Sequence, residues 1–293
     1  MINMHNFSRV SRELLRALAL MVFVVPVFGQ GAAIEPCQAT PAPAKSSPQK
    51  VDERASLLPV DASVPADKDV EKMLAPYSEK VNELSKVIGR LEGKLSKTGV
   101  GGGSLGNFVT NGVKAQAESK LGKPVSLAIV NVGGLRKNEI SAGELRASDI
   151  FELLPFENAL VALDLTGAQL TKLLDVVTRD AQAGARIQFK WNDRNRAEFI
   201  SGKLLDASGK EQEIDPDKIY TVVTIDYLLR VGGGPYAILQ EAKSKTPLNL
   251  TLRDALMNYV KNETAAGRPI RSPIDDRFVQ IGPGPKSTTE TPR

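Results

Sequence analysis

The aliphatic run at residues 125–130 most constrains the fold, because a short apolar run of this kind indicates a buried strand. The run breaks into Asn131 and the pair Gly133-Gly134, and then delivers Arg136. Glycine lets a backbone turn sharply or approach a ligand closely, and arginine grips an anion with two parallel donors. The segment is either an anion or nucleotide cradle or an ordinary strand-to-turn transition, and spacing alone leaves both open.

The rest of the chain alternates between strand-like and helix-like patterns without a regular βαβ repeat. Strands are expected at residues 159–165, 186–191, 197–205, 220–225 and 277–281. Helices are expected at 105–121, 168–178 and 251–263, and after a turn within 141–154, with Ser148 or Asp149 as N-cap. These patterns predict an α+β (mixed α/β) domain, a mixed β-sheet flanked by helices.

The N-terminus has the pattern of a secretory signal peptide. Arg9, Arg12 and Arg16 precede the apolar run 17–28, which is short for a membrane span and is followed by small residues. We expect residues 1–33 to be removed and the protein to be exported, to a periplasmic or extracellular space. The alternative is an uncleaved membrane anchor.

Four further segments follow from composition and periodicity. Residues 34–66 are rich in Pro, Ala, Ser and charge and are expected to form a disordered linker. Apolar residues at three- and four-residue spacing predict a long amphipathic helix over 67–97. The folded domain is then expected at 98–281, and residues 282–293 are expected to be a disordered tail.

The residue inventory excludes several kinds of chemistry. The single cysteine, Cys37, cannot form an internal disulfide, and it is either a lipid-modified residue or a free thiol. The single histidine, His5, lies in the expected signal peptide, so Ser-His-Asp and Cys-His sites and a structural zinc site are not expected. The net charge of +4 is too small to indicate nucleic-acid binding, and the sequence has no basic stripe that would indicate it.

Five short blocks stand out in order along the chain. They are Leu105-Gly106-Asn107-Phe108, Asn131-Val132-Gly133-Gly134-Leu135-Arg136, Leu154-Pro155-Phe156-Glu157-Asn158, Thr166-Gly167-Ala168-Gln169-Leu170, and Gly232-Gly233-Gly234-Pro235-Tyr236 with Tyr227 ahead of it. Their order and spacing resemble the C-terminal domain of the 5′-nucleotidase and UDP-sugar hydrolase family. The resemblance covers residues 67–281 and implies that family's fold, preceded by the helix that links the family's two domains.

The resemblance implies a nucleotide-recognition site. In the family two aromatic rings sandwich the base, which here corresponds to Phe156 and Tyr227; such stacking is worth about 1–3 kcal/mol per base. Asn131 and Arg136 would contact the ribose and phosphate side, with Gly133 and Gly134 allowing close approach. The alternatives are that Phe156 belongs to the core and that Asn131 caps its own turn.

The chain also departs from the family. The family's ribose-binding aspartate aligns with Gly234, and an arginine ahead of Leu-Gly-Asn falls in the glycine run 99–103. The family's two-metal domain, built from Asp, His and Asn, has no counterpart in the sequence. The resemblance therefore implies no catalytic residue, metal or cofactor in this chain, and a divalent metal only on a partner metallophosphatase.

Two functional hypotheses remain open. The first is an exported nucleotide-recognition domain that contributes to nucleotide hydrolysis with a separately encoded metallophosphatase. The second is a non-catalytic nucleoside- or nucleotide-binding or interaction protein with a partly decayed site. In both, the partners are a nucleotide or nucleoside and no nucleic acid, and a membrane is contacted only through an uncleaved or lipid-modified N-terminus.

Overall fold

The computed structural model describes residue 61, residues 63–231 and residues 233–285. The expected signal peptide 1–33, Cys37 and most of the linker lie outside the described residues, as do residues 286–293 of the tail. Contacts divide the chain into Met1–Val64 and Pro65–Arg293, and the description below concerns the second unit. No helix within the described ranges is both long and apolar enough to cross a membrane.

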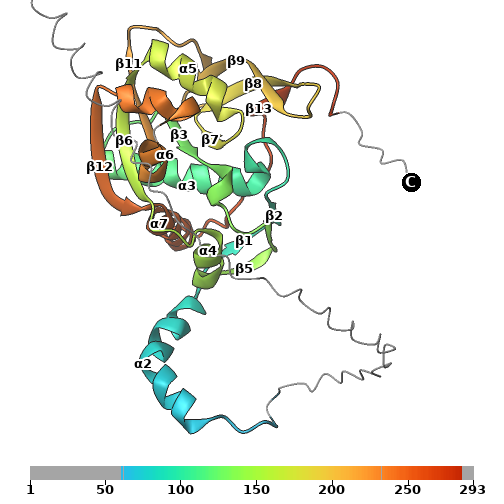
Figure 1. The fold of residues 1–293 in the computed structure, drawn as a ribbon, viewed down its shortest axis with the longest axis vertical. Coiled ribbons are helices and arrows are strands. Elements are labelled where there is room, and N and C mark those ends of the chain that lie inside the picture. The colour runs from blue at the N-terminus through green and yellow to red at the C-terminus, as the bar shows by residue number, and fades with distance from the viewer. Residues whose placement is uncertain (1–60, 62, 232, 286–293) are drawn as a thin grey trace, which may run out of the picture. The chain divides into compact units, whose positions relative to one another are not determined.

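A five-stranded sheet carries the centre of the domain (Figure 1). In spatial order its strands are β12 Ser244–Thr251, β6 Ala159–Thr166, β11 Ile219–Ile225, β3 Leu127–Val130 and β7 Ala181–Ala183. The β11–β3 pair is parallel and the other neighbouring pairs are antiparallel, which confirms the mixed sheet. Every residue of β3 is buried, as its uninterrupted aliphatic sequence predicts for a strand covered on both faces.

A second sheet and two short pairs complete the strands. The second sheet has the order β10 Glu211–Gln212, β9 Ala197–Leu205, β8 Ala185–Trp191 and β13 Phe278–Gln280. The predicted hairpin of β8 and β9 is confirmed, and β13 adds to β8 in parallel. The short pairs join β1 Val87–Leu91 to β5 Gly143–Arg146, and β2 Leu95–Ser96 to β4 Glu139–Ile140.

Helices flank these sheets. They are α3 Gly103–Leu121, α4 Ala147–Leu153, α5 Gly167–Val177, α6 Asp226–Val231 and α7 Leu252–Ala265, with the 3₁₀ turns η1 Val100–Gly102, η2 Val132–Gly134 and η3 Gly234–Glu241. α3 packs against α7 and against β3 and β7, while α5 contacts both sheets. The buried apolar side chains form one cluster, with Phe108 of α3 the largest that is fully buried.

The first described helix is shorter than the sequence predicts. α2 spans Lys68–Leu84 and begins at Asp67, whose side chain accepts hydrogen bonds from the amides of Asp69 and Val70. The predicted helix over 67–97 is therefore wrong beyond Leu84, because the apolar residues that follow form β1 and β2. None of the residues of α2 is buried.

The caps of two other helices differ in how well they were predicted. Gly122 ends α3 in the left-handed conformation, and its amide donates to the carbonyl of Glu118, as expected of a C-terminal glycine. α4 begins after Arg146 rather than after Ser148 or Asp149. Asp149 is instead the third helical residue, and its carboxylate accepts a hydrogen bond of 2.9 Å from the Arg146 amide.

The glycine run 99–103 forms a tight loop in front of α3. Gly101 and Gly103 have φ values of +70° and +55°, which other residues adopt at a cost. A Cβ on Gly101 would lie 2.2 Å from the Phe278 ring, and one on Gly103 would lie 2.3 Å from the Thr98 carbonyl oxygen. The loop is therefore held by its close packing and has little room for larger residues.

Replacing Gly106 by alanine is expected to destabilise the fold. A Cβ there would lie 2.0 Å from the carbonyl oxygen of Gly101, so the glycine loop would have to move. Overpacking of this kind costs about 1–3 kcal/mol, measured as the free energy of unfolding in urea. Gly93→Ala is the control, since nothing lies within 4 Å of its Cβ; equal effects of the two changes would contradict the prediction.

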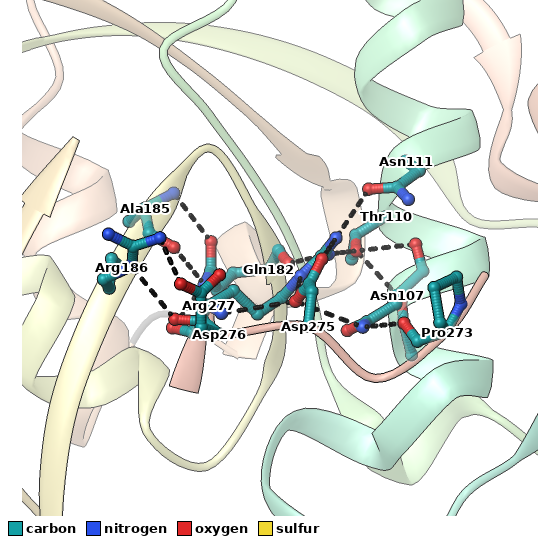
Figure 2. Close-up of polar contacts among 11 residues, drawn as sticks. Asn107, Thr110, Asn111, Gln182, Ala185, Arg186, Pro273, Asp275, Asp276 and Arg277 are labelled. Atoms are coloured by element: carbon teal, nitrogen blue, oxygen red, sulfur yellow. Dashed lines mark hydrogen bonds and ion pairs between the residues drawn. The ribbon is translucent and has the colours of Figure 1, made fainter. Parts of the chain in front are cut away.

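A buried polar network ties the C-terminal segment to α3 and β7 (Figure 2). Its centre is Arg277, only 8% exposed, which donates to both carboxylate oxygens of Asp275 at 2.7 Å. The same guanidinium donates to the Gln182 carbonyl at 2.8 Å and to Asn111 Oδ1 at 3.1 Å. Asn107 of the Leu-Gly-Asn block joins this region by donating to the Pro273 carbonyl at 3.0 Å. The block therefore has a structural role.

Candidate functional site

One cavity brings together all six residues that the resemblance implied. It has a volume of about 680 Å³, within the usual range for small-molecule sites. Its lining comprises the six implied residues Asn131, Gly133, Gly134, Arg136, Phe156 and Tyr227, together with Glu157, Asn158 and Arg230. These residues come from three separate segments: the turn after β3, the loop between α4 and β6, and α6.

The turn after β3 presents an unsatisfied acceptor to the site. Asn131 precedes η2 but makes no side-chain capping bond, so the structure does not support the alternative that it caps its own turn. Its Oδ1 atom is buried and has no hydrogen-bond partner among the described residues. A buried acceptor without a partner costs free energy that a donor on a ligand would recover. A Cβ on Gly134 would lie 3.2 Å from this atom, so a larger residue there would press against the Asn131 side chain.

Arg136 follows at the end of the same turn. Its guanidinium lies over the Phe156 ring, with Cζ 5.8 Å from the ring centroid, and Nη1 is 3.5 Å from the Gly133 carbonyl oxygen. It forms no ion pair with any described residue. The charge is therefore available to an anionic group that enters the cavity.

The two aromatic rings of the cavity are both exposed. Phe156 is 47% and Tyr227 43% exposed, so the alternative that Phe156 belongs to the core does not hold. The loop that carries Phe156 is held from behind by Arg253, which is 8% exposed. Arg253 pairs with Glu157 and stacks on the Phe151 ring at 4.3 Å. This support fixes an exposed ring in place, as a stacking platform requires.

Hydrogen bonds join the three segments to one another. The Arg136 amide donates to the Leu153 carbonyl at 2.9 Å, which links the glycine turn to the end of α4. The Ala159 amide donates to Asp226 Oδ1 at 3.1 Å, which links the Phe156 loop to α6. The cavity therefore exists before any ligand enters it.

Sequence reasoning missed Arg230 and the residues that follow Phe156. Arg230 lies three positions after Tyr227 on α6, so the two share a helix face. That spacing would have identified Arg230 had a helix been expected there. Arg230 forms an ion pair with Asp226 at 3.4 Å, and Glu157 forms one with Arg253. The cavity therefore presents two guanidiniums, and its one lining carboxylate is already paired.

Asp180 lies between α5 and β7 and is 4% exposed. Burial raises the pKa of this carboxyl group to about 6. The hydrogen bond from the Tyr236 hydroxyl, the nearby Val132 amide and the charge of Arg179 oppose that shift without cancelling it. The same burial and the Asp180 charge raise the pKa of Tyr236 above its usual value.

Stability is expected to fall as the pH rises through the titration of Asp180. A carboxyl group with a raised pKa in the folded state binds its proton more tightly there, so its stabilising effect is present below pH 4 and is lost above pH 6. The change corresponds to about 3 kcal/mol. Unfolding in urea at pH 4 to 7, compared between the wild type and Asp180→Asn, measures it. An identical pH profile for the two proteins would contradict it.

The described residues contain no group of three or more His, Cys, Asp or Glu side chains placed to hold a metal ion. The donors that a two-metal phosphatase centre requires are therefore not found in this part of the chain, and no chemical step is assigned to a metal here.

Known proteins resemble this chain over the same region. It is 25% identical over 240 residues to the trifunctional nucleotide phosphoesterase protein YfkN of Bacillus subtilis, covering 77% of this chain and 16% of that protein. It is 26% identical over 170 residues to the protein UshA of Escherichia coli, covering 55% of this chain and 29% of UshA. The chain therefore spans less than a third of the length of either relative.

A solved structure shares the fold. The 5′-nucleotidase precursor from Thermus thermophilus superposes with a TM-score of 0.59 at 22% identity, covering 75% of this chain and 45% of that protein. The family model described as 5′-nucleotidase, C-terminal domain, matches residues 86–241. That match begins before the boundary at residue 98 that the sequence patterns predicted, in agreement with the position of β1. The chain belongs to the family of 5′-nucleotidase C-terminal domains.

Proposed function

We propose that this domain binds a nucleotide in the cavity between the glycine turn, Phe156 and Tyr227. The observation that carries the proposal is the meeting in one cavity of two exposed aromatic rings and a guanidinium that forms no ion pair with any described residue. A base is flat and stacks on either ring, while an anionic phosphate suits Arg136 and Arg230. The Asn131 Oδ1 atom supplies an acceptor for a hydroxyl or amine of the ligand.

We also propose that hydrolysis of the bound nucleotide is carried out by a separately encoded metallophosphatase. Family membership supports a role in nucleotide turnover. The donor set that the described residues provide does not fit a metal centre, which supports a division of labour. The arginine-rich and apolar pattern of the first 33 residues supports export, so that the partner would act in the same compartment.

Calorimetry on the full chain tests the binding step. AMP, adenosine and a UDP-sugar are titrated separately, which distinguishes recognition of the base from recognition of the phosphate. We expect AMP to bind more tightly than adenosine, because only AMP brings an anion to Arg136 and Arg230. Failure of all three to bind would overturn the proposed function.

Phosphate release tests whether a separate protein carries out the hydrolysis. The purified chain with AMP and either Mn²⁺ or Zn²⁺ is expected to release phosphate no faster than buffer alone. Robust turnover by the chain alone would show that catalysis does not need a partner. An accelerated rate when a metallophosphatase encoded beside this gene is added would support the partnership.

The second candidate is a binding protein with no part in hydrolysis. It is favoured by Gly234, which stands where the resemblance leads one to expect a ribose-binding aspartate, and no carboxylate from η3 lines the cavity among the described residues. Adenosine and AMP would then bind, but the chain would not change the rate of any metallophosphatase.

A further inference from the structure

A second cavity adjoins the glycine turn η2. It has a volume of about 580 Å³, which also lies within the usual range for small-molecule sites. Val132 of η2 lines this second cavity, whereas its neighbours Asn131 and Gly133 line the first cavity, which contains Phe156 and Tyr227. The same turn therefore borders two cavities that have no lining residue in common.

Three parts of the chain form the second cavity. The glycine run contributes residues 99–102, Arg179 follows the end of α5, and Trp191 and Arg196 belong to the hairpin of β8 and β9. α5 packs against β9, which brings Arg179 to the hairpin (Figure 1). The cavity thus depends on the tertiary fold and not on one loop.

The charges that line the second cavity are all positive. Arg179 and Arg196 are exposed, no aspartate or glutamate lines the cavity, and neither guanidinium forms an ion pair with a residue in the described part of the chain. Asp180, next to Arg179, is 4% exposed, accepts a hydrogen bond from the Tyr236 hydroxyl and does not line the cavity. Two guanidiniums are therefore available to an anion that enters.

A neighbouring cavity shows on which side of the two arginines an anion fits better. This third cavity, of about 360 Å³, also includes Arg179 and Arg196, but it adds Arg194 together with the carboxylates of Asp175 and Glu198. Those carboxylates would repel an anion. The side of the two arginines that faces the glycine run has no such carboxylate among the described residues, so an anion is favoured there.

The remaining lining of the second cavity is largely apolar. The Trp191 ring lies edge-on to the Phe189 ring, with centroids 5.6 Å apart, and its Nε1 donates to Gln280 Oε1 at 3.0 Å. Val100 and Val132 add aliphatic surface. The space is larger than an inorganic anion needs, so the fitting ligand carries a flat or apolar part beside its charged group.

We propose that the second cavity binds a phosphate-bearing small molecule, with Arg179 and Arg196 on its phosphate and the Trp191 ring beside the rest of the molecule. A phosphate has the charge and the several acceptor oxygens that two guanidiniums can satisfy together. The ligand is a molecule other than the nucleotide of the proposed function, since it occupies a different cavity. The inference therefore does not require that function.

The single tryptophan of the chain reports on this cavity in solution. Trp191 is that residue, and it lines the second cavity but not the first. Pyrophosphate is the probe, titrated into the full chain at about 0.15 M salt so that weak surface attraction is screened. We expect a saturable change in tryptophan fluorescence, with the same dissociation constant by calorimetry. No saturable binding at millimolar pyrophosphate would overturn the proposal.

Two substitutions and one matched control locate the binding. Arg179→Gln and Arg196→Gln should each weaken pyrophosphate binding about fivefold, the upper range for an exposed ion pair, and the double change about 25-fold. Arg90→Gln removes the same charge from an exposed arginine that lines neither cavity, and it should bind as the wild type does. Circular dichroism establishes that each variant is folded. A double variant that binds as tightly as Arg90→Gln would overturn the proposal.

Adenosine and AMP test whether the phosphate belongs to a second molecule. The pyrophosphate titration is repeated with either compound in excess, and we expect an unchanged dissociation constant in both. Loss of pyrophosphate binding with AMP but not with adenosine would show that the phosphate of the nucleotide itself occupies the second cavity, and would overturn the claim of a separate ligand. If neither compound binds the chain, the proposed function fails, while the effects of Arg179→Gln and Arg196→Gln still decide this inference.

Discussion

Phe156→Ala is expected to weaken AMP binding by about five- to 150-fold, which corresponds to the 1–3 kcal/mol of one base stacked on an aromatic ring. The ring is 47% exposed and is held by a loop that Arg253 fixes from behind. Its removal therefore takes away contact with a ligand while leaving the core intact. Calorimetry with AMP gives the dissociation constant, and the free energy of unfolding should stay within about 0.5 kcal/mol of the wild type.

Two controls sharpen this experiment. Phe156→Tyr keeps an aromatic face and should retain most of the affinity. Ile200→Ala removes an apolar side chain that is 42% exposed but does not line the cavity, and should leave the dissociation constant unchanged. If Phe156→Ala and Ile200→Ala behave alike, stacking on Phe156 is not part of recognition.

Arg277→Met is expected to destabilise the domain by about 3 kcal/mol, the lower end of the cost of breaking a buried ion pair. The change leaves the Asp275 carboxylate, the Gln182 carbonyl and Asn111 Oδ1 without their common donor. Asp275 is 41% exposed and stays partly hydrated, which keeps the cost from being larger. Unfolding in urea measures the effect.

The matched control is Arg271→Met, because Arg271 also pairs with a carboxylate, that of Glu92, but is 70% exposed. Exposed ion pairs contribute at most about 1 kcal/mol. The double change Asp275→Asn with Arg277→Met should cost less than the sum of the single changes, since the two residues act as a unit. An effect of Arg277→Met as small as that of Arg271→Met would refute the structural role of the network.

The sequence predicts segments well where one kind of periodicity continues to a clear stop. The end of α3 at Gly122 and the hairpin of β8 and β9 are of this kind. It fails at Val87–Leu91, where apolar residues continue the spacing of α2 but belong to a strand. That strand exists because β5 and α7 lie beside it, and such long-range partners are not encoded in local periodicity.

The residues of the candidate site likewise divide into those that the sequence predicts and those that it does not. The six residues implied by the resemblance meet in one cavity, although their role in binding stays a prediction. Arg230 was missed because α6 was not recognised, and Asp180 was missed because a single aspartate between a helix and a strand has no pattern of its own. Its hydrogen bond with Tyr236 joins residues 56 positions apart in the chain and becomes visible only in three dimensions.

The glycine loop in front of α3 limits which side chains this domain can carry at those positions. The position of the family's missing arginine falls in that loop, where Gly101 meets the Phe278 ring and Gly103 meets a backbone carbonyl. A cation at Gly101 or Gly103 would therefore need a different path of the main chain. Changes in ligand preference are therefore expected at residues such as Arg136 and Arg230, which solvent already reaches.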